Sequence, residues 1–393
     1  MEPPIQGILP STCQWVEIRI SEGKIREIIK LDPPGGKSSD DIYLAQGLTD
    51  IQVNGFGGVD FNEPGLTVDQ VKWVTRELRM EGVVSFLPTL ISGDPEVVKA
   101  NLEIIARAMG EGGSQPSIPG VHLEGPYISP IEGYRGAHNA RWICKPVWED
   151  FLQYYQAAQG HIVLITLAPE IEGALDFIRR VKDLGVVIAL GHHNANPSTI
   201  ARAVDAGASI STHLGNGCAN QIDRHQNPIW PQLAEDRLMA SIIADGAHLT
   251  REEVKVFYKA KGAQRLVLIS DMTKLAGRPE GAYWWDHKKV VLQSGRISYP
   301  DQGVLAGSAM PLRKGLENIM EFTGCSLAEA LEMASENPNR LLGQCHPEML
   351  AVGNPAHIIQ FRFRGGKISI LKTWIGGRLV FEGPDPGDET SPT

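Results

Sequence analysis

The segment Ile118-Pro-Gly-Val-His-Leu-Glu-Gly-Pro-Tyr127 decides how the rest of the chain is interpreted. A short apolar run ends at Glu124, and Gly125 and Pro126 turn the chain immediately afterwards. This pattern places the carboxylate at the tip of a buried strand rather than on the solvated face of a helix. In α/β barrels the carboxyl ends of the strands carry the chemistry. The segment therefore predicts a functional carboxylate at a strand tip.

Short apolar runs alternate with amphipathic stretches of helical length through most of the chain. Eight of these runs predict strands, at residues 48–53, 83–88, 118–124, 162–168, 186–191, 210–213, 239–244 and 265–270. Helices are expected at residues 67–81, 94–109, 146–158, 171–184, 197–206, 250–261, 312–322 and 327–342. This alternation favours the α/β class and a closed (β/α)8 TIM barrel. An open doubly wound sheet is the main alternative, but no Gly-x-Gly-x-x-Gly turn follows the first strand.

Both ends of the chain show the alternating pattern of half-exposed strands. Such strands are expected at Val16–Ile20, Ile25–Ile29 and residues 356–363, 371–375 and 378–381. We therefore predict a small β-sandwich-like domain built from residues 1–46 plus 353–385, with the barrel inserted between them as residues 47–352. Residues 386–393, rich in Pro, Gly and polar residues, are expected to form a flexible tail. Residues 282–300 predict a β-hairpin inserted after the eighth strand.

Composition and charge exclude several classes of protein. Hydrophobic residues make up 42% of the 393 residues and charged residues 21%, as in ordinary globular proteins. The net charge of −9 argues against a nucleic-acid or anionic-membrane partner, which needs a clustered basic surface. No run approaches the roughly 18 apolar residues of a membrane span, and the first residues lack a signal-peptide pattern. Five scattered cysteines without zinc-finger spacing fit a reducing compartment, so we expect a cytoplasmic protein.

Other strand tips also end in polar residues. His192 ends the fifth expected strand and His213 the sixth, and Asp271 follows the eighth. A single buried histidine is more often a hydrogen-bonded core residue than a metal ligand. Histidines at one end of successive strands are harder to explain in that way. Glu124 with His192 and His213 would leave one coordination position open for water, as a catalytic zinc site requires.

The sequence resembles the N-acetylglucosamine-6-phosphate deacetylase family of the amidohydrolase superfamily over nearly the whole chain. His122-Leu-Glu-Gly-Pro-Tyr127 is the most specific motif for this family. Seven further short motifs follow in the family's order along the barrel. They are Asp50-Ile-Gln-Val-Asn-Gly55, Gly136-Ala-His-Asn139, Gly191-His192 with Asn194-Ala195, Thr212-His-Leu214 with Asn216, Ile243-Ala-Asp-Gly-Ala-His248, Ser270-Asp271 and Leu305-Ala-Gly-Ser308.

The resemblance implies hydrolysis of the acetamide of an amino sugar phosphate, most directly N-acetylglucosamine 6-phosphate, to a free amine and acetate. By motif position, Glu124, His192 and His213 would bind one divalent ion per subunit, with Zn2+ as the first choice and Fe2+, Mn2+ and Co2+ as alternatives. Asp271 would be the general acid/base and His138 would contact the substrate carbonyl. The resemblance also implies a homodimer and places at the sugar phosphate Gln52, Ala137, Asn216, Gly217, Arg224, His248, Leu305, Ala306 and Gly307.

The first strand distinguishes this chain from amidohydrolases that hold two metal ions. Those enzymes carry His-x-His where this chain has Gln52-Val-Asn54, and amides are weak ligands beside imidazoles. Residues 162–168 also contain no lysine, which binuclear relatives supply from the fourth strand. We therefore expect a single-metal site.

Several alternatives remain open at this point. Asp271 could orient a ligand instead of transferring protons, and Arg224 could be a solvated loop charge. The loop Gly215–Pro231 and the segment Met272-Thr-Lys274 depart from the family pattern close to where a sugar would lie. The enzyme could thus act on an unphosphorylated N-acetyl hexosamine, a cyclic amide or an N-acyl amino acid. A catalytically inactive barrel that serves as a binding protein would be expected to have lost these ligands or Asp271.

Overall fold

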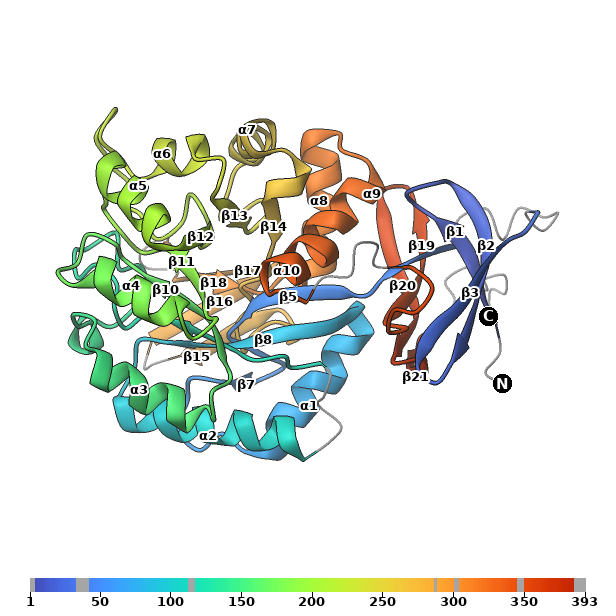
Figure 1. Ribbon diagram of the computed structural model, residues 1–393, viewed down its shortest axis with the longest axis horizontal. Coiled ribbons are helices and arrows are strands. Elements are labelled where there is room, and N and C mark those ends of the chain that lie inside the picture. Colours follow the sequence, from blue (N-terminus) through green and yellow to red (C-terminus); the bar gives the residue numbers. More distant parts are fainter. Residues whose placement is uncertain are drawn as a thin grey trace.

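The computed structural model describes residues 4–32, 42–111, 117–285, 288–299, 304–344 and 350–384. It contains a barrel with a smaller sheet beside it (Figure 1). The predicted tail, residues 386–393, lies outside the described residues. Among those that are described, no helix combines the length and the apolar character needed to cross a bilayer.

Eight parallel strands form the barrel, in the order β14-β13-β12-β11-β10-β9-β8-β5. They are β5 (Leu48–Val53), β8 (Val83–Ile91), β9 (Val121–Glu124), β10 (Ile162–Leu167), β11 (Val187–Leu190), β12 (Ala208–Ser211), β13 (Met239–Ile242) and β14 (Leu266–Leu268). The barrel closes just beyond the last strand, where Val53 pairs with Met272 in a parallel bridge. The predicted (β/α)8 barrel is thus confirmed.

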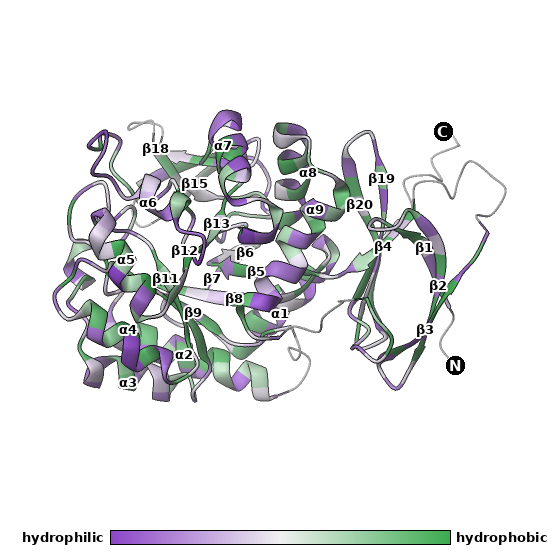
Figure 2. Cartoon of the chain, turned by 45° about the horizontal axis from the view of Figure 1, so that its top comes forward, coloured by the Kyte–Doolittle hydropathy of each residue, from purple (hydrophilic) through white to green (hydrophobic). Residues whose placement is uncertain are grey.

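Helices surround the barrel and bury their apolar faces against it (Figure 2). They are α1 (Val68–Leu78), α2 (Pro95–Gly110), α3 (Trp148–Ala157), α4 (Ala174–Lys182), α5 (Pro197–Ala206), α6 (Ile229–Ala234), α7 (Arg251–Lys261), α8 (Leu312–Thr323), α9 (Leu327–Leu331) and α10 (Asn337–Leu341). Single turns of 3-10 helix occupy Arg79–Glu81, Ala140–Trp142 and Ala263–Arg265. Capping boxes at Thr67, Thr250 and Ser326 fix where α1, α7 and α9 begin, because the cap hydroxyl accepts a backbone N–H that would otherwise lack a partner.

The barrel interior is filled by branched side chains. One cluster of mutually packed residues collects Ile51, Leu87, Leu164, Ala189, Ile210, Ile243, Val267 and Ile269. Residues from strands on opposite sides of a barrel can meet only inside it, so this cluster forms the plug beneath the strand tips. The larger cluster lies between the strands and the helices. Polar residues at the strand tips therefore rest on a rigid apolar base.

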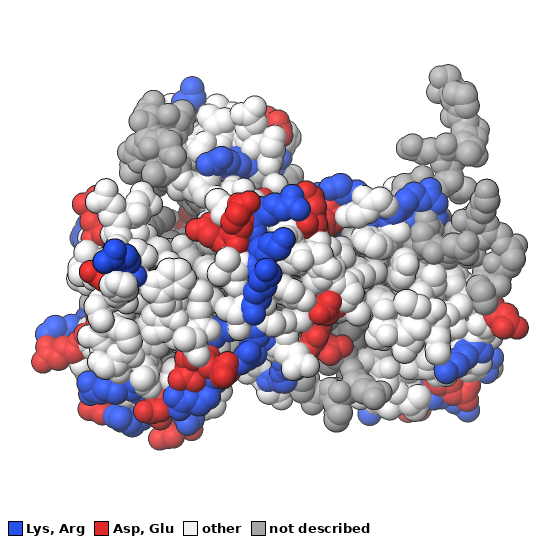
Figure 3. All heavy atoms as spheres, turned by 90° about the horizontal axis from the view of Figure 1, so that it is seen from above, with Lys and Arg blue, Asp and Glu red and all other residues white. Residues whose placement is uncertain are grey.

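Strands from both ends of the chain form one mainly antiparallel sheet, in the order β21-β20-β19-β4-β1-β2-β3. They are β1 (Ile5–Leu9), β2 (Gln14–Ser21), β3 (Lys24–Lys30), β4 (Ile42–Gln46), β19 (Ile358–Arg364), β20 (Lys367–Ile375) and β21 (Arg378–Glu382). The predicted small domain from the two termini is confirmed; its boundaries stay a prediction. On the face shown in Figure 3, the basic side chains form narrow groups, and the longest of these, near the centre of the view, has acidic side chains at its upper end.

Several elements differ from the sequence expectations. The insertion after the eighth strand is a four-stranded sheet instead of a hairpin: β15 (Gly281–Trp285), β16 (Lys288–Gln293), β17 (Arg296–Tyr299) and β18 (Val304–Ser308). A short hairpin, β6 (Gly55–Phe56) with β7 (Val59–Asp60), follows β5. The helix expected over residues 327–342 is divided by a π-helical turn at Glu332–Glu336, which ends two residues before Pro338, a residue that has no N–H to donate.

Candidate metal centre

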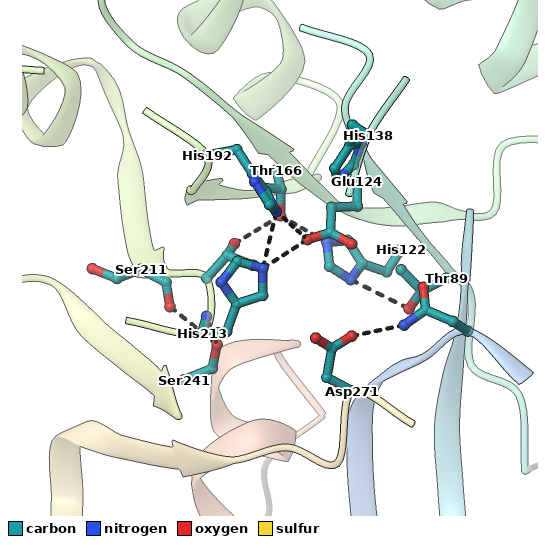
Figure 4. Close-up of polar contacts among 12 residues, drawn as sticks. Thr89, His122, Glu124, His138, Thr166, His192, Ser211, His213, Ser241 and Asp271 are labelled. Atoms are coloured by element: carbon teal, nitrogen blue, oxygen red, sulfur yellow. Dashed lines mark hydrogen bonds and ion pairs between the residues drawn. The ribbon is translucent and has the colours of Figure 1, made fainter. Parts of the chain in front are cut away.

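Three side chains converge at the carboxyl end of the barrel (Figure 4). Glu124 is the last residue of β9. His192 lies two residues beyond the end of β11, and His213 lies two residues beyond the end of β12. Nε2 of His213 lies 2.9 Å from Oε1 of Glu124, and Nε2 of His192 lies 3.2 Å from the same oxygen. The two Nε2 atoms are 3.1 Å apart. The structure therefore brings the three predicted ligands to one point, with all three side chains buried.

The chain bends in the same unusual way at three of the strand tips. The φ angles are +53° at His192, +30° at His213 and +48° at Asp271. Residues other than glycine seldom adopt this left-handed conformation, and it is concentrated at functional sites. At each of these tips the backbone turns sharply just where the polar side chain must face its neighbours.

The hydrogen bonds of His192 fix its tautomer. Its Nδ1 lies 2.9 Å from the carbonyl oxygen of Tyr134, which can only accept. Nδ1 therefore carries the proton, and Nε2 presents a lone pair to Glu124 and His213. Gly217 lies against the same ring: a β-carbon there would lie 2.8 Å from Nδ1. The family resemblance implies that Gly217 lies at the sugar phosphate, and in the structure this glycine also makes room for the imidazole.

Electrostatics around Glu124 and His213 oppose the effect of burial. Burial alone would raise the pKa of Glu124, but the adjacent imidazoles of His192 and His213 hold it well below its usual value. Burial would lower the pKa of His213, but the hydrogen bond and charge of Glu124 raise it. The cluster thus holds a carboxylate together with a proton on an imidazole. A divalent ion can replace that proton, and one carboxylate with two imidazoles is a donor set that suits Zn2+ and its neighbours.

Asp271 follows β14 and faces this cluster across the barrel mouth (Figure 4). Burial and the negative charge of Glu124 raise the pKa of Asp271 to about 6. Opposing contributions come from the charges of His213 and His248 and from a hydrogen bond donated by Asn54. A carboxylate with such a pKa can accept and return a proton near neutral pH.

Other predicted residues lie around the same mouth. His138 is buried in the loop after β9, and its ring meets that of His192 edge to face with centroids 4.5 Å apart. Nδ1 of His248 lies 2.7 Å from a carboxylate oxygen of Asp245. Nε2 of Gln52 and Nδ2 of Asn216 are enclosed and have no partner in the described part of the chain, so both are donors available to a ligand.

The inserted sheet approaches the site through β18, which contains Leu305, Ala306 and Gly307. Its last residue, Ser308, forms a parallel bridge with Met272, next to Asp271. Ala137 is exposed beside His138. Arg224 lies apart on an exposed loop, where its Nε donates to Nε2 of His225 at 3.1 Å. Among the described residues no hydrogen bond or ion pair joins Arg224 to the metal-binding candidates.

Sequence reasoning missed several residues that support the site. Tyr134 acts through its carbonyl, which carries no residue signature. Ser241 accepts the backbone N–H of His213 at 2.8 Å. Ser92 contacts His138, but the second strand was expected to end at Pro88, whereas β8 continues to Ile91. A rule that searches every strand tip for polar residues would have found Ser92 if the strand had been given its full length.

Two further histidines, His122 and His193, are buried near the cluster. Nε2 of His122 lies 2.7 Å from the hydroxyl oxygen of Thr166, within the barrel. Burial lowers the pKa of both His122 and His193 to about 4, so both are neutral. Nδ1 of His193 accepts the backbone N–H of Ala195. Neither imidazole contacts the converging ligand atoms.

Comparison with known proteins agrees with this site. Residues 44–380 match the model of the Amidohydrolase family. The chain is 31% identical to N-acetylglucosamine-6-phosphate deacetylase of Bacillus subtilis, covering 83% of each chain. It is 32% identical to N-acetylgalactosamine-6-phosphate deacetylase of Escherichia coli O157:H7, covering 93% of this chain and 94% of that relative.

The solved structure of N-acetylglucosamine-6-phosphate deacetylase from Thermotoga maritima superposes with a TM-score of 0.84 at 27% identity. The superposition covers 97% of this chain and all of the Thermotoga chain. These matches confirm the resemblance inferred from the sequence motifs. The chain therefore belongs to the amidohydrolase family and, within it, to the group that contains the N-acetylglucosamine-6-phosphate deacetylases.

Proposed function

We propose that this chain is a metal-dependent deacetylase that converts N-acetylglucosamine 6-phosphate to glucosamine 6-phosphate and acetate. The convergence of Glu124, His192 and His213 opposite Asp271 is the observation that carries this proposal. It supplies a cation site and a proton-transfer group on the two sides of one barrel mouth. The names of the related proteins supply the substrate class.

Each residue has a distinct task in the proposed reaction. Glu124, His192 and His213 would hold a divalent cation, which lowers the pKa of water from about 15.7 toward ~7 and polarises a carbonyl. Asp271 accepts a proton from the attacking water and returns it to the nitrogen as the C–N bond breaks. His138 donates a hydrogen bond to the amide oxygen as negative charge develops there. The products are acetate and the free amine.

The sugar phosphate would be held by residues around the same mouth. We assign His248, Arg224, Asn216 and Gln52 to polar contacts, and Ala137, Gly217 and the backbone of residues 305–307 to the walls. Arg224 is exposed, and among the described residues no hydrogen bond or ion pair joins it to the cluster, which favours its action on a neighbouring subunit of a homodimer. A guanidinium fork suits a phosphate group. Trp230 in α6, the helix that follows the loop of Arg224, is 55% exposed and would be covered in such a dimer.

We further propose Zn2+ as the native ion, one per subunit, and a cytoplasmic location. The mixed nitrogen and oxygen donor set supports zinc, with Fe2+, Mn2+ and Co2+ as alternatives. The thiols of Cys13, Cys144, Cys218 and Cys325 are all free, as expected in a reducing compartment.

N-acetylgalactosamine 6-phosphate is a second candidate substrate, because relatives named for the two sugars match this chain almost equally, at 31% and 32% identity. Acetate release should be measured with both sugar phosphates and with unphosphorylated N-acetylglucosamine. We expect kcat/KM to be highest for a phosphorylated sugar and activity to disappear on chelation. Equal turnover of the unphosphorylated sugar would contradict the proposed requirement for a phosphate. Full activity after exhaustive chelation would contradict the proposed metal dependence.

A further inference from the structure

Ser92 lies directly behind the ring of His138. It follows the last residue of β8, and both residues are buried. The backbone N–H of Ser92 donates to Nδ1 of His138 at 3.3 Å. The hydroxyl oxygen of Ser92 lies 2.9 Å from the same nitrogen. One residue thus presents two groups to one ring nitrogen.

This contact determines which nitrogen of His138 carries the proton. A backbone N–H can only donate, so Nδ1 must offer a lone pair. An imidazolium would set Nδ1–H against the N–H of Ser92, so the neutral ring is the form that fits. The Ser92 hydroxyl then donates to Nδ1 as well, and the single ring proton resides on Nε2. No hydrogen bond among the described residues uses this Nε2–H.

We infer that Ser92 is a positioning residue that fixes His138 as the Nε2–H tautomer, so that the ring donates to the amide oxygen of the substrate. The inference rests on the proposed function and adds to it the means by which His138 is made a donor. In the other tautomer Nε2 would carry a lone pair and repel the developing negative charge. Ser92 therefore acts on the reaction only through His138.

Other contacts of His138 do not select a tautomer. The edge-to-face contact with His192 restrains the plane of the ring but is compatible with a proton on either nitrogen. Arg135 bonds only to the backbone of His138: its carbonyl accepts the N–H, and its guanidinium donates to the carbonyl. Ser92 alone among the described residues meets a ring nitrogen by a hydrogen bond.

The Glu124-Gly125 pair connects the contact between Ser92 and His138 to the metal centre. Gly125 has a φ of +85°, in the left-handed region that favours glycine. A β-carbon built on Gly125 would overlap the hydroxyl oxygen of Ser92. The glycine thus leaves the space that this hydroxyl occupies against His138. The motif that contains Glu124 therefore also leaves room for the Ser92 hydroxyl that fixes the tautomer of His138.

The tautomer can be measured directly by nitrogen-15 NMR of the full-length, zinc-loaded protein labelled at histidine. His138→Gln identifies the signals of His138. We expect the wild-type ring to show a protonated Nε2 and a lone pair on Nδ1. Ser92→Ala is expected to mix the two tautomers and to lower kcat on the order of tenfold with little change in KM, since the backbone donor remains. Ser92→Thr keeps the hydroxyl and should restore both the single tautomer and the wild-type kcat.

Ser85→Ala is the matched control, because Ser85 lies on the same strand and contacts neither His138 nor the metal-binding candidates. A wild-type proton on Nδ1 would overturn the inference, as would an unchanged tautomer and kcat in Ser92→Ala. If Ser92→Ala does not fold, Ser92→Cys serves instead. The NMR measurement needs no substrate. Failure of the wild type to deacetylate any sugar phosphate would therefore refute the proposed function and leave the tautomer result to be judged separately.

Discussion

The side-chain amide of Asn54 donates a 2.7 Å hydrogen bond to Oδ1 of Asp271, across the seam where the barrel closes. The backbone supports the same pair of segments, because the N–H of Asp271 donates to the carbonyl of Gln52 at 3.1 Å. One carboxylate oxygen of Asp271 is thereby engaged, and Oδ2 is left to face the barrel mouth. Asn54, which the sequence analysis contrasted with the metal ligands of binuclear amidohydrolases, here holds the carboxylate of Asp271 in place.

Replacement of Asn54 is expected to act through Asp271. Asn54→Ala removes the hydrogen bond and should lower kcat about tenfold. Asn54→Asp adds a second carboxylate, which should raise the pKa of Asp271 above its value of about 6. Since the base must be unprotonated, the acidic limb of the pH–kcat profile should move to higher pH in Asn54→Asp. An unshifted limb would show that Asp271 is not the titrating group.

Metal affinity should depend on pH through His213. Its pKa is raised by Glu124, so below this pKa a proton competes with the ion for the imidazole. We expect zinc affinity to fall as pH decreases across roughly pH 8 to 5, with proton release on binding. Competition with a chromophoric chelator measures the affinity, and titration calorimetry in two buffers counts the protons. His161→Gln changes a histidine outside the cluster and should leave the zinc affinity and the number of released protons unchanged. A zinc affinity that does not depend on pH would contradict the prediction.

The purified protein should contain one tightly bound ion per chain. Gln52 and Asn54 offer only amides, and β10 provides no lysine to bridge a second ion. Elemental analysis after dialysis should give a stoichiometry of one, falling to near zero in His213→Ala. Two ions per chain at full occupancy would refute the single-metal prediction.

Glu317 should be a determinant of stability at the junction of α8 with β20. Its buried carboxylate accepts the N–H of Ile368 at 3.0 Å and lies 2.6 Å from Nζ of Lys314. Glu317→Gln keeps the shape but removes the charge, and should cost about 1–3 kcal/mol of unfolding free energy. Thermal unfolding of Glu317→Gln can be compared with Glu321→Gln, an exposed position on the same helix, which should change little.

The pH dependence of this contribution has a definite sign. Burial would raise the pKa of Glu317, but the hydrogen bonds from Ile368 and Lys314 hold it below its usual value. The stabilisation is therefore fully present above the pKa of an unfolded glutamate, about 4.3, and is lost as pH falls through the lower folded value. The melting temperatures of wild type and Glu317→Gln should converge in acid. A constant difference would exclude Glu317 as the titrating group.

The fold and the position of the metal-binding candidates could be predicted because both depend on local patterns. Glu124, His192 and His213 each end an apolar run, and a parallel barrel brings all such ends to one face. The boundaries of the strands and helices were less predictable. Pro88 was expected to end the second strand, but β8 continues beyond it to Ile91. The short helix α6 was missed because Pro228 and Pro231 favour a loop.

The supporting contacts could not be predicted because they join distant segments. Asn54 and Asp271 are 217 residues apart, and Ser92 and His138 are 46 apart. Both pairs exist only once the barrel has closed and the loop after β9 has folded back. A sequence pattern with periods of two or 3.6 residues contains no information on such pairs.

The sheet of the small domain has a consequence for biosynthesis. Strand β4 lies between β1 and β19, so its outer edge remains unpaired until almost the whole polypeptide has left the ribosome. An unpaired strand edge is a template for association with other nascent chains. The N-terminal strands therefore remain incompletely paired while the barrel is being synthesised. A chain that terminates before β19 would expose the unpaired edge of β4, which would favour chaperone binding or aggregation.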